Sequence, residues 1–383
     1  MMNFRRIGSL PPYAFAEVNR RKQDVRDSGI DVVDLGFGNP DIPSPEIAVS
    51  TLRTAALDPA NHRYSVSRGT DDLRRALADR YQRRFGVTLN PDTEVINTIG
   101  AKEGMSHLMW ALLQPGDAAI VPEPSYPLHI YAPAIAGAEV RKAPIDSEED
   151  YFDVVNRMFL NSWPRPRVII VSFPHNPTTK TVDVSFFERL VGFAHEHDVV
   201  IVHDFAYADV AFDGYQPPSL LEVDGAREVG VELYSLTKGH SMAGWRVGFV
   251  SGNAEVVDAL AKLKSYLDYG TFQPIQMAAT ATLDHSDPFV AEVNKTYQER
   301  RDLLIDGLAR VGWTIESPRA TMFVWAPIPR RFEKMGSFGF SMHLLERAGV
   351  ATSPGVGFGD SGEGYVRFAL VDDADRIVEA TAR

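Results

Sequence analysis

Short runs of apolar residues, many of them β-branched, alternate with longer amphipathic segments through the middle of the chain. A sheet whose strands are joined by helices produces this alternation. Several of the runs are apolar throughout, which is typical of strands covered by helices on both faces. We therefore expect an α/β fold. The candidate strands are residues 94–99, 118–121, 167–173, 199–203, 231–236 and 247–251, and the clearest helices between them are residues 102–113 and 185–197.

The pattern changes after about Asp284. A charged helical stretch at 290–311 precedes two candidate strands, 321–326 and 364–369, which indicates a second, smaller α+β unit. The chain of 383 residues also exceeds the usual size of one hydrophobic core. The opening residues carry a helical segment at 13–28 and then a turn-rich stretch. We expect an arm and part of the small unit at 1–45, a large unit at 46–284, and the remainder of the small unit at 285–383.

The charge balance excludes two broad classes of partner. The chain has 39 Lys and Arg against 51 Asp and Glu, a net charge of −12, which argues against general binding to nucleic acid or to an anionic membrane. The absence of cysteine excludes disulfides, thiol catalysis and thiolate metal sites, and it suits a reducing cytoplasm. No apolar stretch reaches the length of a membrane span, and the first residues do not resemble a secretory signal. We expect a cytoplasmic enzyme with no metal site.

Lys238 follows a buried strand in the run YSLTKGHSMAGWRVG. A lysine after a strand is ordinarily a solvated surface residue. Here its neighbours are hydroxyl side chains at Ser235 and Thr237, two glycines, and Arg246. Hydrogen-bond donors, positive charge and room for close backbone approach are what a phosphorylated cofactor needs.

A second candidate phosphate element lies at the start of the helix at 102–113. There a strand leads through Gly100 and Ala101 to Lys102. The unpaired amides and the dipole of a helix N-terminus favour an anion. A glycine between a strand and a helix is equally good turn chemistry without any ligand. This segment contains no GxxxxGK[ST] or GxGxxG motif, so a nucleotide-binding loop has no support here.

Polar residues also follow two neighbouring strands: Asn176 after residues 167–173, and Asp204 and Tyr207 after residues 199–203. A carboxylate at such a position is as easily a helix cap. In an enzyme that uses pyridoxal phosphate, the carboxylate would instead pair with the pyridine nitrogen and keep it protonated, so that the ring withdraws electrons. Asn176 and Tyr207 would then hydrogen-bond the phenolic oxygen.

Seven stretches in family order resemble motifs of the fold type I, class I and II aminotransferases, and they cover essentially the whole chain. They are GNPD (38–41), RYSVSRGTDDLRRAL (63–77), EPSYP (123–127), FPHNPT (173–178), HDFAYAD (203–209), SLTKGHSMAGWRVGF (235–249) and GYVRFAL (364–370). Three further stretches, at 129–141, 264–276 and 353–360, resemble the bacterial glutamate-pyruvate (alanine) transaminases, a group similar to the LL-diaminopimelate aminotransferases. The resemblance implies a large domain with a mostly parallel mixed sheet between helices, and a smaller α+β domain.

The resemblance also implies a role for each candidate residue. Lys238 would carry pyridoxal phosphate covalently and move the substrate proton. Arg367 would bind the substrate α-carboxylate, assisted by Gly38 and Asn176, and Tyr13 would line the substrate pocket. The cofactor would be held by Gly100, Ala101, Lys102, Tyr126, Asn176, Asp204, Tyr207, Ser235, Thr237, Arg246 and Tyr64.

Tyr64 resembles the tyrosine that reaches the phosphate from a partner subunit, which implies a homodimer with shared active sites. Tyr266, Tyr269 and Thr271 are further candidates to line the substrate pocket. Two positions depart from the family pattern. Thr237 stands where many relatives carry serine, and His175, where relatives often have a small residue, is interpreted as an exposed loop histidine.

Three functions remain open on the sequence. The preferred one is a ping-pong aminotransferase that uses alanine or glutamate with pyruvate or 2-oxoglutarate, and its closest alternatives act on LL-diaminopimelate or aspartate. Residues 262–276 lack an arginine, which disfavours a dedicated dicarboxylate specificity. A C–S β-lyase dependent on pyridoxal phosphate shares the same lysine, aspartate and arginine. A non-catalytic regulator of the same fold would need a DNA-binding domain, for which the chain has no spare length.

Overall fold

A computed structural model describes residues 4–8, 10–11, 14–145 and 148–383. Its centre is a seven-stranded sheet with the strand order β2-β8-β7-β6-β5-β3-β4, in which β8 runs antiparallel to both neighbours and the other pairs are parallel. These strands are β2 (Val95–Thr98), β3 (Ala118–Glu123), β4 (Glu139–Pro144), β5 (Pro166–Val171), β6 (Val200–Asp204), β7 (Gly230–Ser235) and β8 (Gly248–Gly252). The expected mostly parallel, mixed α/β sheet is confirmed, and β4 is a strand that the sequence pattern did not reveal.

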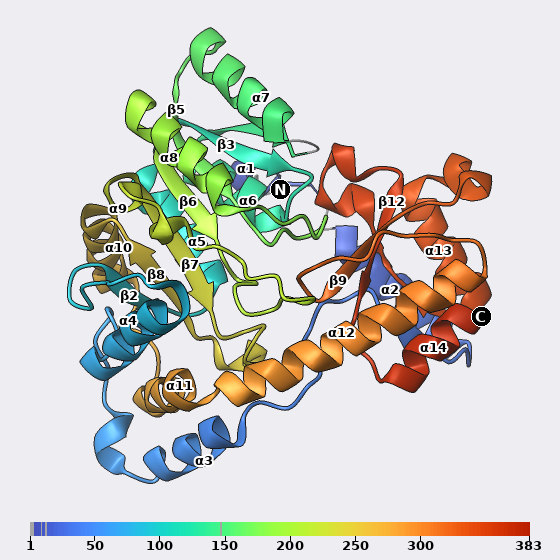
Figure 1. Ribbon diagram of the computed structural model, residues 1–383, viewed down its shortest axis with the longest axis horizontal. Helices are drawn as coiled ribbons and strands as arrows, with labels where there is room; N and C mark the ends of the chain where they lie inside the picture. The colour runs from blue at the N-terminus through green and yellow to red at the C-terminus, as the bar shows by residue number, and fades with distance from the viewer. Residues whose placement is uncertain (1–3, 9, 12–13, 146–147) are drawn as a thin grey trace.

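Helices cover both faces of this sheet (Figure 1). They are α4 (Asp71–Phe85), α5 (Ala101–Leu112), α6 (Pro127–Ala136), α7 (Glu148–Asn161), α8 (Val184–His197), α9 (Ala226–Val229) and α10 (Ala254–Leu267). Outside these layers, α3 (Glu46–Ala55) packs on α11 (Gln273–His285), which packs on α4. Successive side chains of β5 show how the layers form, because neighbouring residues of a strand point to opposite faces. Val168 and Ile170 pack in the cluster formed with α5 and α10, whereas Ile169 and Val171 pack against α7 and α8.

A second group of elements is built from the two ends of the chain (Figure 1). Its helices are α2 (Ala14–Asp27), α12 (Asp287–Arg310), α13 (Gly336–Ala348) and α14 (Ala374–Ala382), and its strands are β1 (Val33–Asp34), β9 (Phe323–Pro327), β10 (Val350–Ala351), β11 (Ser353–Pro354) and β12 (Tyr365–Ala369). A short helix, α1 (Arg5–Gly8), precedes α2 in the chain. Strands β11, β12 and β9 form an antiparallel sheet, and β1 pairs with β10. The early segment that contains β1 therefore joins elements more than 300 residues later in the sequence.

Parallel strands place the residues that follow them at one edge of the sheet. Asp204 ends β6, Ser235 ends β7, and the loop to Asn176 follows β5, so these positions meet at the same edge. Ligands of open α/β sheets bind at this edge. Within the described residues, none of the helices combines the length and the apolar character that crossing a membrane requires.

Candidate active site

A cavity of about 400 Å³ lies at the carboxyl ends of β5, β6 and β7. It gathers most of the candidate residues from distant parts of the sequence. Those that line it are Gly38, Ala101, Lys102, Tyr126, Asn176, Asp204, Tyr207, Ser235, Thr237, Lys238, Arg246 and Arg367. The strand-end candidates Asn176, Asp204, Tyr207 and Lys238 therefore share one cavity with candidates that the family resemblance implied.

The amine of Lys238 lies inside this cavity. Its Nζ atom donates a hydrogen bond to the carbonyl oxygen of Gly38 at 2.8 Å. Desolvation, with the nearby charges of Arg367 and Arg246, lowers the pKa of Lys238 to about 7. Because only the neutral amine is a nucleophile or a base, a large fraction of this lysine is reactive near neutral pH.

Asp204 is held in place by a chain of hydrogen bonds. Nε2 of the fully buried His129 lies 2.8 Å from Oδ2 of Asp204, and Nδ1 of His129 lies 2.9 Å from Oγ of Ser125. The amide of Ala206 donates to the other carboxylate oxygen at 3.2 Å. The sequence analysis missed His129. Its position in the first turn of α6, just after Tyr126, was the one available signal.

An anion cradle lies where β2 leads into α5. Gly100 adopts a φ of 78°, and a Cβ atom there would lie 2.3 Å from Nη2 of Arg246. A Cβ on Gly248 would lie 2.5 Å from the backbone nitrogen of Ala101. The two glycines thus allow a guanidinium and a β-strand to approach the N-terminus of α5, whose amides and dipole favour an anion.

Arg367 enters the cavity from β12, on the opposite side from the large sheet. Its Nη1 donates to Oδ1 of Asn176 at 2.7 Å. Its guanidinium lies between two rings, 3.9 Å from the centroid of Phe323 and 4.6 Å from that of Phe358. This sandwich fixes the plane of the guanidinium, which prepares it to bind a carboxylate with two hydrogen bonds.

The donor set fits pyridoxal phosphate. A cationic cradle at one end suits the phosphate, and a carboxylate at the other end suits a protonated ring nitrogen. A lysine amine lies in the same cavity. Burial raises the pKa of Tyr207 above its usual range, so its hydroxyl stays protonated and can donate to a phenolic oxygen.

The remaining candidates lie elsewhere. Tyr64 is 85% exposed and contacts Tyr269, with 4.5 Å between the ring centroids. Tyr269 and Tyr266 are also exposed, and neither lines the cavity within this chain. Thr271 is buried and donates to Oδ1 of Asn97 at 3.0 Å. Tyr13 lies outside the described residues.

The interpretation of His175 as an exposed loop histidine is wrong, because its side chain is fully buried. The loop after β5 folds back on itself, with the amide of His175 donating to the carbonyl of Lys180 at 2.9 Å. Nδ1 of His175 lies 2.8 Å from Oγ1 of Thr178, within the same loop. Burial, together with His129 and Lys180 nearby, lowers the pKa of His175 well below its usual range, so the ring is neutral.

The chain is similar to known aminotransferases over nearly its whole length. A family model described as aminotransferase class I and II matches residues 30–380. The glutamate-pyruvate aminotransferase AlaC of Escherichia coli is 48% identical, with 98% of this chain and 92% of that protein aligned. An LL-diaminopimelate aminotransferase of Dehalococcoides mccartyi is 41% identical, with 99% and 97% aligned.

Solved structures of aminotransferases share this fold. A mutant of the Thermus thermophilus aspartate aminotransferase superposes with a TM-score of 0.90 at 27% identity and covers 100% of this chain and 98% of that one. Family, fold and cavity chemistry agree. The chain belongs to the class I and II aminotransferases, enzymes that depend on pyridoxal phosphate and transfer an amino group to a 2-oxo acid.

Proposed function

We propose that this aminotransferase exchanges an amino group between alanine or glutamate and pyruvate or 2-oxoglutarate. One observation carries the proposal: the cavity that holds Lys238 offers a single ring-sandwiched arginine, Arg367, to the substrate. The other arginine that lines the cavity, Arg246, lies at the anion cradle beside Gly100. Among the described residues, the lining thus leaves one arginine, which suits the α-carboxylate that alanine, glutamate, pyruvate and 2-oxoglutarate all carry. Alanine and pyruvate need no further cation, whereas the second carboxylate of glutamate or 2-oxoglutarate would need a partner other than Arg367.

We assign the cofactor contacts as follows. Arg246, Ser235, Thr237 and the backbone at Gly100, Ala101 and Lys102 would hold the phosphate, Asp204 would hold the ring nitrogen, Asn176 and Tyr207 would hold the phenolic oxygen, and Tyr126 would cover the ring. Bound in this way, pyridoxal phosphate supplies an electron-withdrawing ring that stabilises negative charge at the substrate α-carbon.

The chain's own groups then orient the substrate and move one proton. Arg367 binds the α-carboxylate with two charge-assisted hydrogen bonds, and Gly38 limits the cavity beside it. The Lys238 amine would take the proton from the substrate α-carbon and release it on the other side of the transferred nitrogen. A pKa of about 7 for Lys238 is well matched to such proton transfer at neutral pH. Water would supply the keto oxygen of the 2-oxo acid that leaves, and the amino group would stay behind on the cofactor. A second 2-oxo acid would then take up that amino group by the reverse sequence and release the water.

A specific observation keeps LL-diaminopimelate as a second candidate. Relatives at about 40% identity bear that name, as the D. mccartyi protein shows at 41%. This substrate carries a second carboxylate and a second ammonium group, which would need partners beyond Arg367. Tyr64, Tyr266 and Tyr269 are exposed and do not line the cavity of their own chain. They could contact this substrate only in the active site of a second subunit.

We also propose a homodimer with shared sites. Tyr64, Tyr266 and Tyr269 are exposed by 85%, 84% and 61%, and such exposed large rings are typical of interfaces.

Within each subunit we propose an arm and part of the small domain at 1–45, a large domain at 46–284, and the small domain at 285–383. The pairing of β1 with β10 supports this division, and the absence of cysteine supports a cytoplasmic location. Sedimentation of the holoenzyme at several concentrations tests the proposed homodimer.

Single half-reactions test the substrate. The holoenzyme is mixed with one L-amino acid at a time, including LL-diaminopimelate, and the visible absorbance of the cofactor is followed. We expect rapid conversion with alanine and glutamate. Fast conversion by diaminopimelate with no change from alanine or glutamate would replace the preferred substrates with the second candidate. A Lys238→Ala variant should bind the cofactor yet lose turnover, and turnover at the wild-type rate would refute the role of Lys238.

A further inference from the structure

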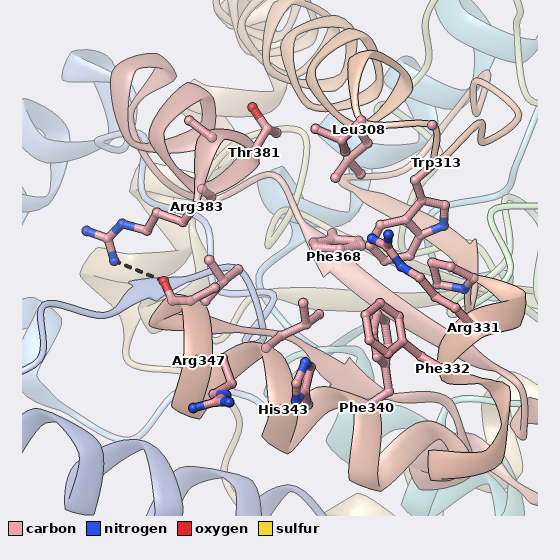
Figure 2. Close-up of a pocket in the computed structure, with 18 of the residues that line it drawn as sticks. Leu308, Trp313, Arg331, Phe332, Phe340, His343, Arg347, Phe368, Thr381 and Arg383 are labelled. Carbon is pink, nitrogen blue, oxygen red and sulfur yellow. Dashed lines mark hydrogen bonds between the residues drawn. The ribbon is translucent and has the colours of Figure 1, made fainter.

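A second cavity, of about 530 Å³, lies among the C-terminal elements (Figure 2). It is enclosed by the end of α12, by α13 and α14, and by the short helix η4 (Arg330–Met335). It shares no lining residue with the active-site cavity. Its volume falls within the range of roughly 300–1,000 Å³ that is typical of pockets for small organic ligands.

The floor of this cavity is aromatic. Trp313 packs edge-on against Phe340 and Phe368, with ring centroids 5.6 and 5.7 Å apart, and Phe332 lies 5.2 Å from Phe340. The indole nitrogen of Trp313 donates to the carbonyl of Pro327 at 2.8 Å, so its polar atom is already satisfied. The floor therefore offers apolar ring surface, which suits an aromatic ligand.

The rim of the cavity is positively charged. The lining includes four arginines and one histidine but no carboxylate side chain. Arg383 is paired with Asp31 and Glu379, whereas Arg330, Arg331 and Arg347 have no ion pair with any described residue. Figure 2 shows the side chain of Arg331 beside the rings of the floor, whereas the side chains of Arg347 and Arg383 extend away from them. In a chain with a net charge of −12, this concentration of positive charge beside a cavity lined by partly and fully buried rings points to an anionic ligand.

We propose that this cavity binds a small aromatic carboxylate, with its rings on the floor and its carboxylate at the arginine rim. A free amino acid fits less well, because its ammonium group would meet the same arginines. The cavity is also separate from the reaction. Phe368 faces this floor from β12, whereas its neighbour Arg367 faces the active site, since successive residues of a strand point to opposite sides. A ligand bound here thus contacts the strand that carries Arg367 without reaching Lys238.

Calorimetric titration of the holoenzyme with sodium naphthalene-2-carboxylate tests the proposal. We expect saturable binding. The uncharged naphthalene-2-carboxamide should bind about tenfold more weakly, equivalent to about 1.4 kcal/mol. A variant that combines Arg330→Gln, Arg331→Gln and Arg347→Gln should lose a similar factor for the carboxylate. The matched control is Arg310→Gln, which removes one exposed arginine at the end of α12 outside the lining and should leave binding unchanged.

Two further measurements keep the result unambiguous. The triple variant should still perform the amino acid half-reaction, which shows that it folds and retains its active site. An Arg367→Gln variant should bind the probe with wild-type affinity. Loss of binding in that variant would place the probe in the active-site cavity and overturn the proposal. Equal affinity for the carboxylate and the carboxamide, or no binding at all, would overturn it as well.

Discussion

Replacement of His129 by phenylalanine tests whether the hydrogen-bond chain behind Asp204 matters for catalysis. Phenylalanine keeps a ring of similar size in a fully buried position but has neither nitrogen. The change therefore removes the bond at 2.8 Å from Nε2 to Asp204 and the bond at 2.9 Å from Nδ1 to Ser125. The backbone bond from Ala206 to Asp204 stays.

The structure sets the expected size of the effect. A hydrogen bond to a charged group contributes about 1.5–3 kcal/mol. The side chain of Asp204 is 13% exposed, so water can replace part of the lost bond, and the lower half of that range applies. Since about 1.4 kcal/mol is tenfold in rate, kcat/KM should fall by about tenfold to fiftyfold. His129 acts through Asp204, so we describe it as a positioning residue.

The assay needs a readout that a purely structural defect would leave unchanged. The visible absorbance of the bound cofactor should titrate at a higher pH in the variant. A less firmly held carboxylate leaves the ring nitrogen less positive, so the ring withdraws fewer electrons from the nitrogen that joins it to Lys238 and the pKa of that nitrogen rises. Ser125→Ala is the matched control, since it removes only the bond to Nδ1 at the far side of His129. It should lower kcat/KM much less. Wild-type kcat/KM together with an unchanged titration in His129→Phe would refute this reasoning.

Three other predictions follow from the same cavity. Arg367→Ala removes two charge-assisted hydrogen bonds to the α-carboxylate, each worth about 1.5–3 kcal/mol, and should lower kcat/KM by about a hundredfold or more in steady-state assays. The pKa of Lys238 is lowered to about 7, so the amine is protonated below that pH and neutral above it. The rate at which the apoenzyme takes up pyridoxal phosphate should rise with pH up to about 7 and then level off, and a rate independent of pH would contradict the assignment. Gly100→Ala adds a Cβ 2.3 Å from Nη2 of Arg246 and should weaken cofactor affinity in an equilibrium titration. Gly86→Ala, at a glycine with a similar positive φ and no atom within 4 Å, controls for backbone strain alone and should leave cofactor affinity unchanged.

The sequence predicted those strands that are buried on both faces. Strands β3, β5 and β7 are apolar because helices cover both sides, and that burial is what the pattern reports. Strand β4 lies at the edge of the sheet, with Glu139 exposed and Arg141 paired to it at 2.9 Å, so its polar residues conceal it. The two-residue strands, such as β1, are too short to show any period.

The active-site residues also fall into two groups: those that follow buried strands in the sequence, and those that only packing brings together. Asp204 and Lys238 stand directly after buried strands, so local pattern marked them as candidates, and the family resemblance supplied their expected roles. Phe323 and Phe358, which hold the guanidinium of Arg367, lie 35 residues apart in sequence and meet only through packing. His175 was misjudged for the same reason: its loop is polar in sequence, yet its burial depends on how that loop folds back.

The contact between Asn176 and Arg367 links cofactor binding to substrate binding. A guanidinium has only donors, so the oxygen of the Asn176 amide must point towards Arg367, as the 2.7 Å bond from Nη1 to Oδ1 requires. The amide nitrogen is then directed away from Arg367 as a donor, and the protonated hydroxyl of Tyr207 is a second donor lining the same cavity. Two donors suit an electron-rich phenolic oxygen and would disfavour a ligand that presents a donor of its own. The arginine proposed to bind the substrate carboxylate thereby also sets which way the amide faces, so the two binding steps depend on one side-chain orientation.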